Sequence, residues 1–458
     1  DVFGFLLDTQ AEEWAELCVR HGNEPTARKG FLQRLLNQLA KRGTVDVLRH
    51  GVEDLGVNIR LAFPQPAHGL TPEVVARYEA NRLTVIRQLP YKEGSDETID
   101  LGLFVNGIPV ATAELKNQVT GQNVDDAVKQ YRRRDPGTPI TSRLGMVHFA
   151  VDTERVMMTT RLDGDDTEFL PFNRGHNGGK GNPPNPAGHT TSYLWEQVWS
   201  RDNWMDLLFR YVHQEKPTAE SPKGRVIFPR FHQWDAVRRL EAECTANGAG
   251  SNYLVQHSTG SGKSNTIAWL CHRLHSLHRD DNKVFDKVIV ITDRIVLDQQ
   301  LQDTIYQFEH AHGLVQKIDQ DSNQLAEAIT GQTARIIITT LQKFPFILDK
   351  VSELEDRTYA IVADEAHSSQ SGESAKALRT ALGAGDEIDT GDSIEDALVA
   401  AATARGRQPN LSYFAFTGTP KNQTLELFGR QRPDGKYEAF HLYPMRQAIE
   451  EGFILDVL

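Results

Sequence analysis

The sequence of 458 residues is poor in cysteine, has no long apolar run and carries no excess of basic residues. Its three cysteines, Cys18, Cys244 and Cys271, lie far apart and form no C-x-x-C pair. This spacing supports neither a disulfide framework nor a structural zinc site, and we expect a reduced, cytoplasmic protein. No apolar run approaches the roughly 20 residues of a membrane helix, and no basic segment followed by an apolar one opens the sequence. We therefore expect neither a membrane partner nor export.

The charge balance is acidic. Lys and Arg number 50 against 62 Asp and Glu, which gives a formal net charge of −12 at pH 7. Such a chain does not coat nucleic acid with its whole surface, although local basic sites can still bind it. Hydrophobic residues make up 39% and charged residues 24% of the sequence, a composition typical of globular proteins. At roughly 100–200 residues per domain, the length predicts two to four domains.

Apolar periodicity divides the chain into two parts. Phe31, Leu35 and Leu39 are spaced for one face of a helix, and residues 1–60 are predicted to be mostly helical. Strands are predicted farther on, two of them joined by Asn106-Gly107 as a hairpin. These strands cover residues 83–86, 98–105, 108–115 and 147–151. We place one domain at residues 1–214 and a linker at residues 215–228.

The second part alternates β-branched runs with helical patterns, which favours a parallel sheet with crossover helices. We assign residues 229–440 to this α/β lobe and residues 441–458 to the start of a connection to another lobe. The predicted strands lie at residues 253–256, 288–292, 335–339, 359–363 and 413–417.

A glycine-containing loop follows the first of these strands and precedes a predicted helix. Its backbone N–H groups and the helix N-terminus can bind phosphates, Lys263 can neutralise the β/γ charge, and Ser264 can ligate Mg²⁺. His257 replaces the first glycine of the general pattern, so a chance loop is the alternative; the flanking strand and helix argue against it. The candidate ATP-binding residues are Thr259, Gly260, Ser261, Gly262, Lys263 and Ser264.

Two carboxylates end the strand predicted at residues 359–363. Asp364 would hold Mg²⁺, and Glu365 would orient the water that attacks the γ-phosphate. A solvated acidic turn is the alternative. The pairing of these acids with a phosphate loop, each at the end of a core strand, indicates nucleotide hydrolysis.

Taken together, these segments resemble the superfamily 2 helicases and translocases. Residues 258–264 match motif I of that family, residues 364–367 match a DEAH-type motif II, and residues 416–420 match motif III. The resemblance implies a RecA-like lobe that binds ATP, with Gln233 reading adenine. It further implies coupling through His367, Thr417 and Thr419, and DNA contacts through Thr340, Gln342 and Lys343.

Charged residues also gather on the predicted hairpin. Asp100 and Glu114 lie on facing strands, and Lys116 points to the same face as Glu114. Their neighbours are apolar, so unpaired burial of these charges would be costly unless a metal or an ionic partner compensates. Spacing alone leaves two readings open, a Mg²⁺ site and a structural salt bridge of Lys116.

This hairpin resembles the PD-(D/E)xK nuclease core, and its longer string resembles the R (HsdR) subunit of type I restriction enzymes. The resemblance implies that Asp100, Glu114 and Lys116 are catalytic and that the two acids bind Mg²⁺. Related nucleases carry Q-x-x-x-Y on the next helix, whereas here Tyr131 follows Gln130 directly and Ala127 precedes it by four residues. Candidates for DNA or metal-site support are Gln130, Tyr131 and Arg132, and the run of arginines at residues 132–134 could contact phosphates or form a solvated face.

The family implies an α/β protein with a PD-(D/E)xK domain followed by a RecA-like P-loop lobe. Its expected function is ATP-dependent translocation on duplex DNA and Mg²⁺-dependent cleavage of foreign unmethylated DNA, in a complex with methyltransferase (M) and specificity (S) subunits. Two alternatives remain: a nuclease–helicase of another defence or repair system, and a non-catalytic subunit that binds ATP structurally. Too few residues follow Pro420 for the second motor lobe, so we expect this chain to hold only the first and not to translocate alone.

Overall fold

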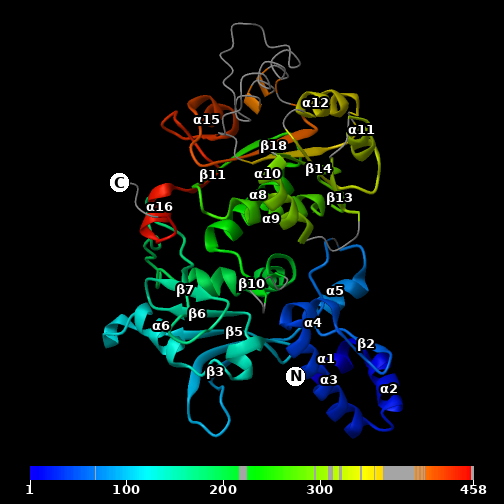
Figure 1. Cartoon of the computed structure of the whole chain (residues 1–458), viewed down its shortest axis with the longest axis vertical. Coiled ribbons are helices and arrows are strands. Elements are labelled where there is room, and N and C mark those ends of the chain that lie inside the picture. The colour runs from blue at the N-terminus through cyan, green and yellow to red at the C-terminus, as the bar shows by residue number, and fades with distance from the viewer. Residues whose placement is uncertain are drawn as a thin grey trace. The chain divides into compact units, whose positions relative to one another are not determined.

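The computed structural model describes residues 1–67, 69–215, 224–292, 295–307, 313–318, 322–340, 343–354, 356–364, 398–399, 402–403, 406 and 408–454. At residues 143, 295–300, 344 and 345 it describes the backbone alone. The chain separates into two compact units (Figure 1). Unit 1 comprises Asp1–Arg174 and Gly181–Arg230, and unit 2 comprises Gly175–Lys180 and Phe231–Leu458.

Unit 1 begins with helices, as the periodicity predicts. In the longest of them, Phe31, Leu35 and Leu39 face the core, and the Asn23 side chain caps the first turn by accepting from the Thr26 N–H at 2.9 Å. The helices are α1 (Val2–Thr9), α2 (Ala11–Arg20), α3 (Glu24–Arg42) and α4 (Thr44–His50), followed by the short strands β1 (Val52–Asp54) and β2 (Val57–Ile59) and by α5 (Pro72–Glu79).

A six-stranded mixed sheet in the order β3-β4-β5-β6-β7-β8 forms the body of unit 1. Asn106 and Gly107 have positive φ angles of 51° and 83° and close the predicted hairpin. The strands are β3 (Leu83–Pro90), β4 (Thr98–Val105), β5 (Ile108–Leu115), β6 (Val147–Val151), β7 (Val156–Thr159) and β8 (Leu170–Pro171).

Helix α6 (Val124–Arg133) is the crossover between the parallel strands β5 and β6 and packs on both of them (Figure 1). Val124, Ala127 and Tyr131 form the buried face of this helix, which an Asn123 capping box begins. The C-terminal side chains of α6 therefore lie beside the carboxyl end of β5.

The rest of unit 1 is built from short elements. A two-stranded antiparallel ladder joins β9 (His213–Glu215) to β10 (Arg225–Ile227), so part of the predicted linker is strand, while residues 216–223 lie outside the described residues. The remaining segments are η1 (Gln118–Thr120), η2 (Ile140–Leu144), η3 (Leu194–Val198), α7 (Arg201–Asp206) and η4 (Leu207–Tyr211).

Unit 2 contains a seven-stranded sheet in the order β15-β16-β14-β17-β18-β11-β21, and every neighbouring pair in it is parallel. Strands β14, β17 and β18 are buried along their whole length, which explains their continuous apolar sequences. The strands are β11 (Asn252–His257), β14 (Lys287–Thr292), β15 (Val315–Lys317), β16 (Ile336–Thr340), β17 (Tyr359–Ala363), β18 (Leu411–Thr417) and β21 (His441–Tyr443).

Helices cover this sheet, and short two-stranded ladders lie in segments that connect a helix to the next strand of the sheet. The helices are α8 (Phe231–Asn247), α9 (Lys263–His275), α10 (Ile295–Gln307), α11 (Ser322–Thr330), α12 (Phe344–Glu353), α15 (Asn422–Phe428) and α16 (Met445–Glu450). The ladders pair β12 (His278–Arg279) with β13 (Asn282–Lys283) and β19 (Arg430–Gln431) with β20 (Tyr437–Glu438). A mixed sheet in unit 1 and a parallel sheet in unit 2 confirm the predicted fold class. Within the described part of the chain, no helix is both long and apolar enough to cross a membrane.

Candidate functional site

The carboxylates of the β4–β5 hairpin converge as their spacing predicts. The register pairs Leu101 with Ala113. Asp100 and Glu114 are the next residues away from the turn, so they lie opposite each other on the two neighbouring strands. Asp100 is half-buried; its Oδ2 accepts from the Leu115 N–H at 2.8 Å, and its Oδ1 accepts from the Gln88 amide at 3.1 Å. Both oxygens of Asp100 are thereby held in place at the end of the hairpin.

Glu114 is completely buried, at 0% exposure, and makes an ion pair with Arg134. Arg134 Nε donates to Glu114 Oε1 at 2.8 Å, and Arg134 Nη2 donates to the same oxygen. Glu114 Oε2 is buried without a hydrogen-bond partner. Burial raises the pKa of Glu114 to about 7; Arg134 opposes the rise, and the negative charge of Asp100 adds to it.

This donor set fits a divalent cation. A buried carboxylate oxygen without a partner, next to a second carboxylate, is stabilised when a cation binds. Among the described residues no group of three or more His, Cys, Asp or Glu could hold a metal ion. A cation at Asp100 and Glu114 would therefore complete its shell with water or substrate oxygens, as Mg²⁺ commonly does.

Lys116 is held by an amide from the crossover helix. Its Nζ donates to Gln130 Oε1 at 2.5 Å, and the residue is half-buried. The ion pair of Glu114 is made with Arg134. The structure therefore places Gln130 beside Lys116, in the position of a support for this lysine.

Two other predicted DNA contacts on α6 have different surroundings. Tyr131 is completely buried, and its hydroxyl lies 2.8 Å from Thr112 Oγ1, which also contacts His148 Nδ1 at 2.7 Å. A completely buried ring offers no surface to DNA in this structure, and a role of Tyr131 in supporting the site stays a prediction. Arg132 is half-buried and donates to the Thr167 carbonyl through Nη2 at 3.1 Å.

The phosphate loop lies between β11 and α9, at the carboxyl end of the parallel sheet. Gly260 and Gly262 have φ angles of 76° and 79°, and Gly262 caps α9. The hydroxyls of Ser258 and Ser261 are buried without hydrogen-bond partners, whereas Thr259 is exposed. Lys263 is buried and its Nζ contacts the His257 carbonyl at 3.5 Å; Ser264 is half-buried. Unpartnered hydroxyls and inward-turned backbone fit an anionic ligand with several acceptor oxygens.

Gln233 lies behind this loop. Its Nε2 donates to the Gly262 carbonyl at 3.0 Å and to the Ser261 carbonyl at 3.4 Å. The preceding residue, His232, contacts the Ser261 carbonyl through Nε2 at 3.1 Å. Both side chains therefore support the loop from α8.

Other residues that the sequence predicts for the motor lobe lie at the same edge of the sheet. Asp364 directly follows β17, and Thr417 ends β18 opposite Gln256 of β11. Thr417 is completely buried, and its hydroxyl accepts from the Thr419 N–H at 3.3 Å. Thr340 ends β16, and both it and Lys343 are half-buried. Glu365, His367 and Gln342 lie outside the described residues.

Comparison with protein-family models matches both units. Residues 232–458 match the SWI2/SNF2 ATPase model, and residues 53–167 match the model for the N terminus of type I restriction enzyme R proteins. The first range contains the phosphate loop, and the second contains the carboxylate hairpin. The first unit is thus similar to type I restriction enzyme R proteins, and the second to SWI2/SNF2 ATPases.

Curated relatives of this chain are type I restriction enzyme endonuclease subunits. One, from Staphylococcus aureus strain COL, is 24% identical over 82% of this chain and 36% of its own length. Another, from Staphylococcus saprophyticus, is 23% identical over 94% of this chain and 41% of its own length. The chain therefore spans well under half the length of these relatives. A solved fragment assigned to an HsdR subunit of Vibrio vulnificus is 16% identical, with a TM-score of 0.32, over 80% of this chain and 56% of that one.

Sequence reasoning missed the site role of Arg134. It treated this residue as part of a basic run, but Arg134 is 7% exposed and ion-paired, whereas its neighbour Arg133 is exposed. A spacing signal was present. Four residues along a helix advance about 6 Å, and two residues along a strand advance about 6.6 Å. The spacing from Gln130 to Arg134 therefore matches the spacing from Lys116 to Glu114.

A histidine pair next to the phosphate loop was also missed. His257 Nε2 lies 2.9 Å from His441 Nδ1, and His441 Nε2 lies 3.3 Å from Asp235 Oδ2. Burial alone would raise the pKa of Asp235, but His441 and the nearby Arg239 and Arg238 lower it to about 2. The substitution of His257 for the first glycine of the loop was the available signal.

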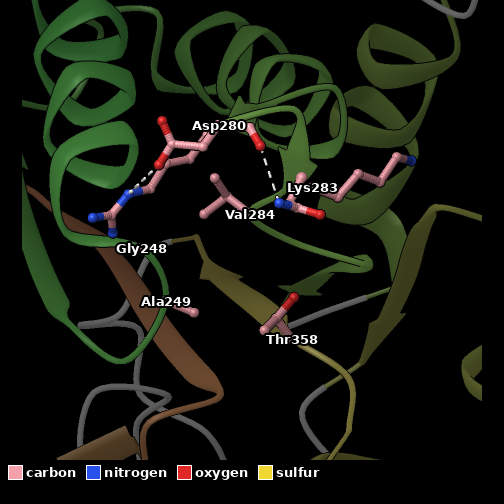
Figure 2. A pocket seen from close by; sticks show the side chains of 8 residues that line it. Gly248, Ala249, Asp280, Lys283, Val284 and Thr358 are labelled. Carbon is pink, nitrogen blue, oxygen red and sulfur yellow. Dashed lines mark hydrogen bonds and ion pairs between the residues drawn. The ribbon is translucent and has the colours of Figure 1, made fainter. Parts of the chain in front are cut away.

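A pocket of about 320 Å³ lies elsewhere in unit 2 (Figure 2). Thr358 directly precedes β17, so the pocket lies at the amino end of the sheet, opposite the phosphate loop. Ligands of parallel α/β sheets bind at the carboxyl end, and this pocket is therefore not a candidate nucleotide site. Its lining residues are Gly248, Ala249, Arg279, Asp280, Asn282, Lys283, Val284 and Thr358.

Proposed function

We propose that this chain is the nuclease and first motor part of the endonuclease subunit of a type I restriction enzyme. The complete enzyme would translocate on duplex DNA at the expense of ATP and cleave foreign unmethylated DNA in the cytoplasm, in complex with M and S subunits. One observation carries the proposal: a carboxylate–lysine cluster in unit 1 and a phosphate loop in unit 2 occur in a single chain. The names of the curated relatives support it.

The nuclease chemistry would belong to Asp100, Glu114 and Lys116. The two carboxylates would hold Mg²⁺, which supplies Lewis-acid stabilisation of the phosphodiester when bound. Lys116, kept in place by Gln130, would stabilise the charge that develops on the scissile phosphate or orient the attacking water. Arg132 and Gln130 remain candidates for support of DNA next to this cluster.

The motor chemistry would belong to the carboxyl edge of the parallel sheet. The backbone of residues 259–262 and the Lys263 ammonium would bind the phosphates of ATP, while Ser264 and Asp364 would hold its Mg²⁺. Glu365 would orient water, Gln233 would contact adenine, and His367, Thr417 and Thr419 would couple hydrolysis to DNA. Thr340, Gln342 and Lys343 would contact a DNA strand through its backbone.

Reconstitution tests this function. The complete R protein, combined with the M and S subunits, is mixed with unmethylated DNA that carries a target site, together with Mg²⁺ and ATP. We expect cleavage that requires ATP and Mg²⁺ and that fails on methylated DNA. Cleavage that is independent of ATP, or an R protein that does not join the M and S subunits, would contradict the proposal.

A further inference from the structure

Arg134 forms a buried ion pair at the nuclease site, and this pair has an asymmetry. Both guanidinium contacts, from Nε at 2.8 Å and from Nη2, go to Glu114 Oε1. The second oxygen, Oε2, has no hydrogen-bond partner although it is buried. A side chain that only neutralised Glu114 could bind both oxygens as a fork, because a guanidinium matches a carboxylate in that way.

Arg134 is itself anchored on its other sides. Its Nη2 also donates to the Thr98 carbonyl at the start of β4, and its guanidinium carbon lies 4.7 Å from the centre of the Tyr91 ring. Its backbone N–H donates to the Tyr131 carbonyl at 3.1 Å, where α6 ends. Glu114, the Thr98 carbonyl and the Tyr91 ring together surround the guanidinium and leave it little freedom to move away from the site.

We propose that Arg134 is a positioning residue of the nuclease site, which holds Glu114 by Oε1 and leaves Oε2 to bind a divalent cation together with Asp100. The inference rests on the proposed nuclease function. Gln130 on α6 and Arg134, which directly follows that helix, thereby fix Lys116, which directly follows β5, and Glu114 near its end. The crossover helix supplies the supporting contacts for the acid and the lysine alike.

The opposite role makes a different prediction. If Arg134 competed with the cation for Glu114, its removal would free both oxygens, and the chain would bind Mg²⁺ more tightly. If Arg134 positions Glu114, its removal leaves a buried carboxylate without its anchor, and binding weakens. Loss of such supporting partners typically weakens metal affinity by roughly 10–100-fold.

The test measures Mg²⁺ binding to the full chain by isothermal titration calorimetry, without DNA or ATP. Arg134→Leu removes every guanidinium contact, and Arg134→Lys keeps the charge and one donor. Arg161→Leu is the matched control, because its guanidinium belongs to the same unit but is exposed and pairs with Asp163. Asp100→Ala reports whether the bound metal is at this site, and circular dichroism checks the fold of each variant.

We expect Arg134→Leu to weaken Mg²⁺ binding by roughly 10–100-fold, Arg134→Lys to show an intermediate loss, and Arg161→Leu to match the parent chain. If Arg134→Leu does not fold, Arg134→Gln replaces it with the same expected direction. Unchanged or tighter binding in the folded Arg134 variants would overturn the inference. If the parent chain itself bound no Mg²⁺, or if Asp100→Ala had no effect, the proposed nuclease site would fail instead.

Discussion

At the residue scale, Gly262 carries two constraints of the phosphate loop at once. Its φ angle is 79°, a left-handed conformation that costs other residues roughly 1–2 kcal/mol. A Cβ atom at this position would also lie 2.5 Å from Gln233 Nε2, which supports the loop. Glycine is required here both by its own backbone and by its neighbour.

Gly262→Ala should therefore weaken nucleotide binding as well as stability. We expect loss of about 1–2 kcal/mol in the free energy of unfolding and at least a tenfold weaker affinity for a fluorescent ATP analogue. Gly435→Ala is the matched control, because Gly435 has a φ angle of 83° but a Cβ added there would meet no atom within 4 Å. Equal nucleotide affinities in the two variants would contradict the account of the loop.

His148 gives unit 1 a pH dependence. Burial lowers the pKa of His148 to about 4, below its ordinary value of about 6.5. Between these values the unfolded chain binds a proton that the folded chain does not, so stability is fully present above about pH 6.5 and falls as the pH drops toward 4. Its Nδ1 contact with Thr112 joins β6 to β5 at this point.

From pH 7 to pH 5, His148 should account for a loss of about 2 kcal/mol in the free energy of unfolding. Urea unfolding at the two pH values measures it, and His148→Gln should reduce the difference by about that amount. His189→Gln, at an exposed position of the same unit, is the control. A parental and a His148→Gln chain with the same pH dependence would rule out this role.

At the element scale, β21 connects the last part of the chain to the phosphate loop. Tyr443 accepts the Ser258 N–H at 2.9 Å through its carbonyl, and its ring stacks on His232 with centroids 3.7 Å apart. His441 contacts His257 and Asp235 from the same strand. A short strand therefore supports both the backbone and the side chains of the loop.

His441→Ala should loosen the phosphate loop. It removes a partner from the buried His257 and the half-buried Asp235, which costs about 1–3 kcal/mol, so we expect ATP affinity to fall roughly 5–150-fold. Leu442→Ala is the control, because Leu442 lies on the same strand with its side chain 50% exposed to solvent. Equal ATP affinities of the two variants, measured by calorimetry, would show that β21 does not support the loop.

The elements that the sequence could predict are those with strong local patterns. The strands with β-branched runs were found because burial on both faces requires continuous apolar residues, and β4 and β5 were found because Asn-Gly marks their turn. Strands β15 and β21 have three residues each and mixed polarity, so no local pattern distinguishes them from loops. Their pairing depends on partners far along the chain.

The candidate sites follow the same division. The sequence was sufficient to propose Asp100, Glu114, Lys116 and the phosphate loop, because the residues that carry each chemistry lie close together along the chain. The contacts of Arg134 and Tyr131 could not, because only the packing of α6 on β5 decides which side chains of that helix are buried. Local sequence leaves the rotation of a polar helix on its sheet undetermined.

At the scale of the whole molecule, we infer two independent sites, one in each unit. One contains the acids of the β4–β5 hairpin, and the other contains the phosphate loop between β11 and α9. Neither site uses a residue of the other. A change in one should therefore leave the other intact while abolishing the combined activity of the complete enzyme.

The most direct measurement compares DNA cleavage and ATP hydrolysis by the reconstituted enzyme for Lys263→Ala and Asp100→Ala, with the exposed Lys436→Ala and Asp163→Ala as controls. We predict that Asp100→Ala abolishes cleavage and retains DNA-stimulated ATP hydrolysis. Lys263→Ala should abolish ATP hydrolysis and ATP-driven cleavage yet keep the Mg²⁺ affinity of the hairpin, while both controls retain both activities. Loss of cleavage and of ATP hydrolysis in the folded Asp100→Ala enzyme, together with loss of hairpin Mg²⁺ binding in Lys263→Ala, would contradict the two-site account.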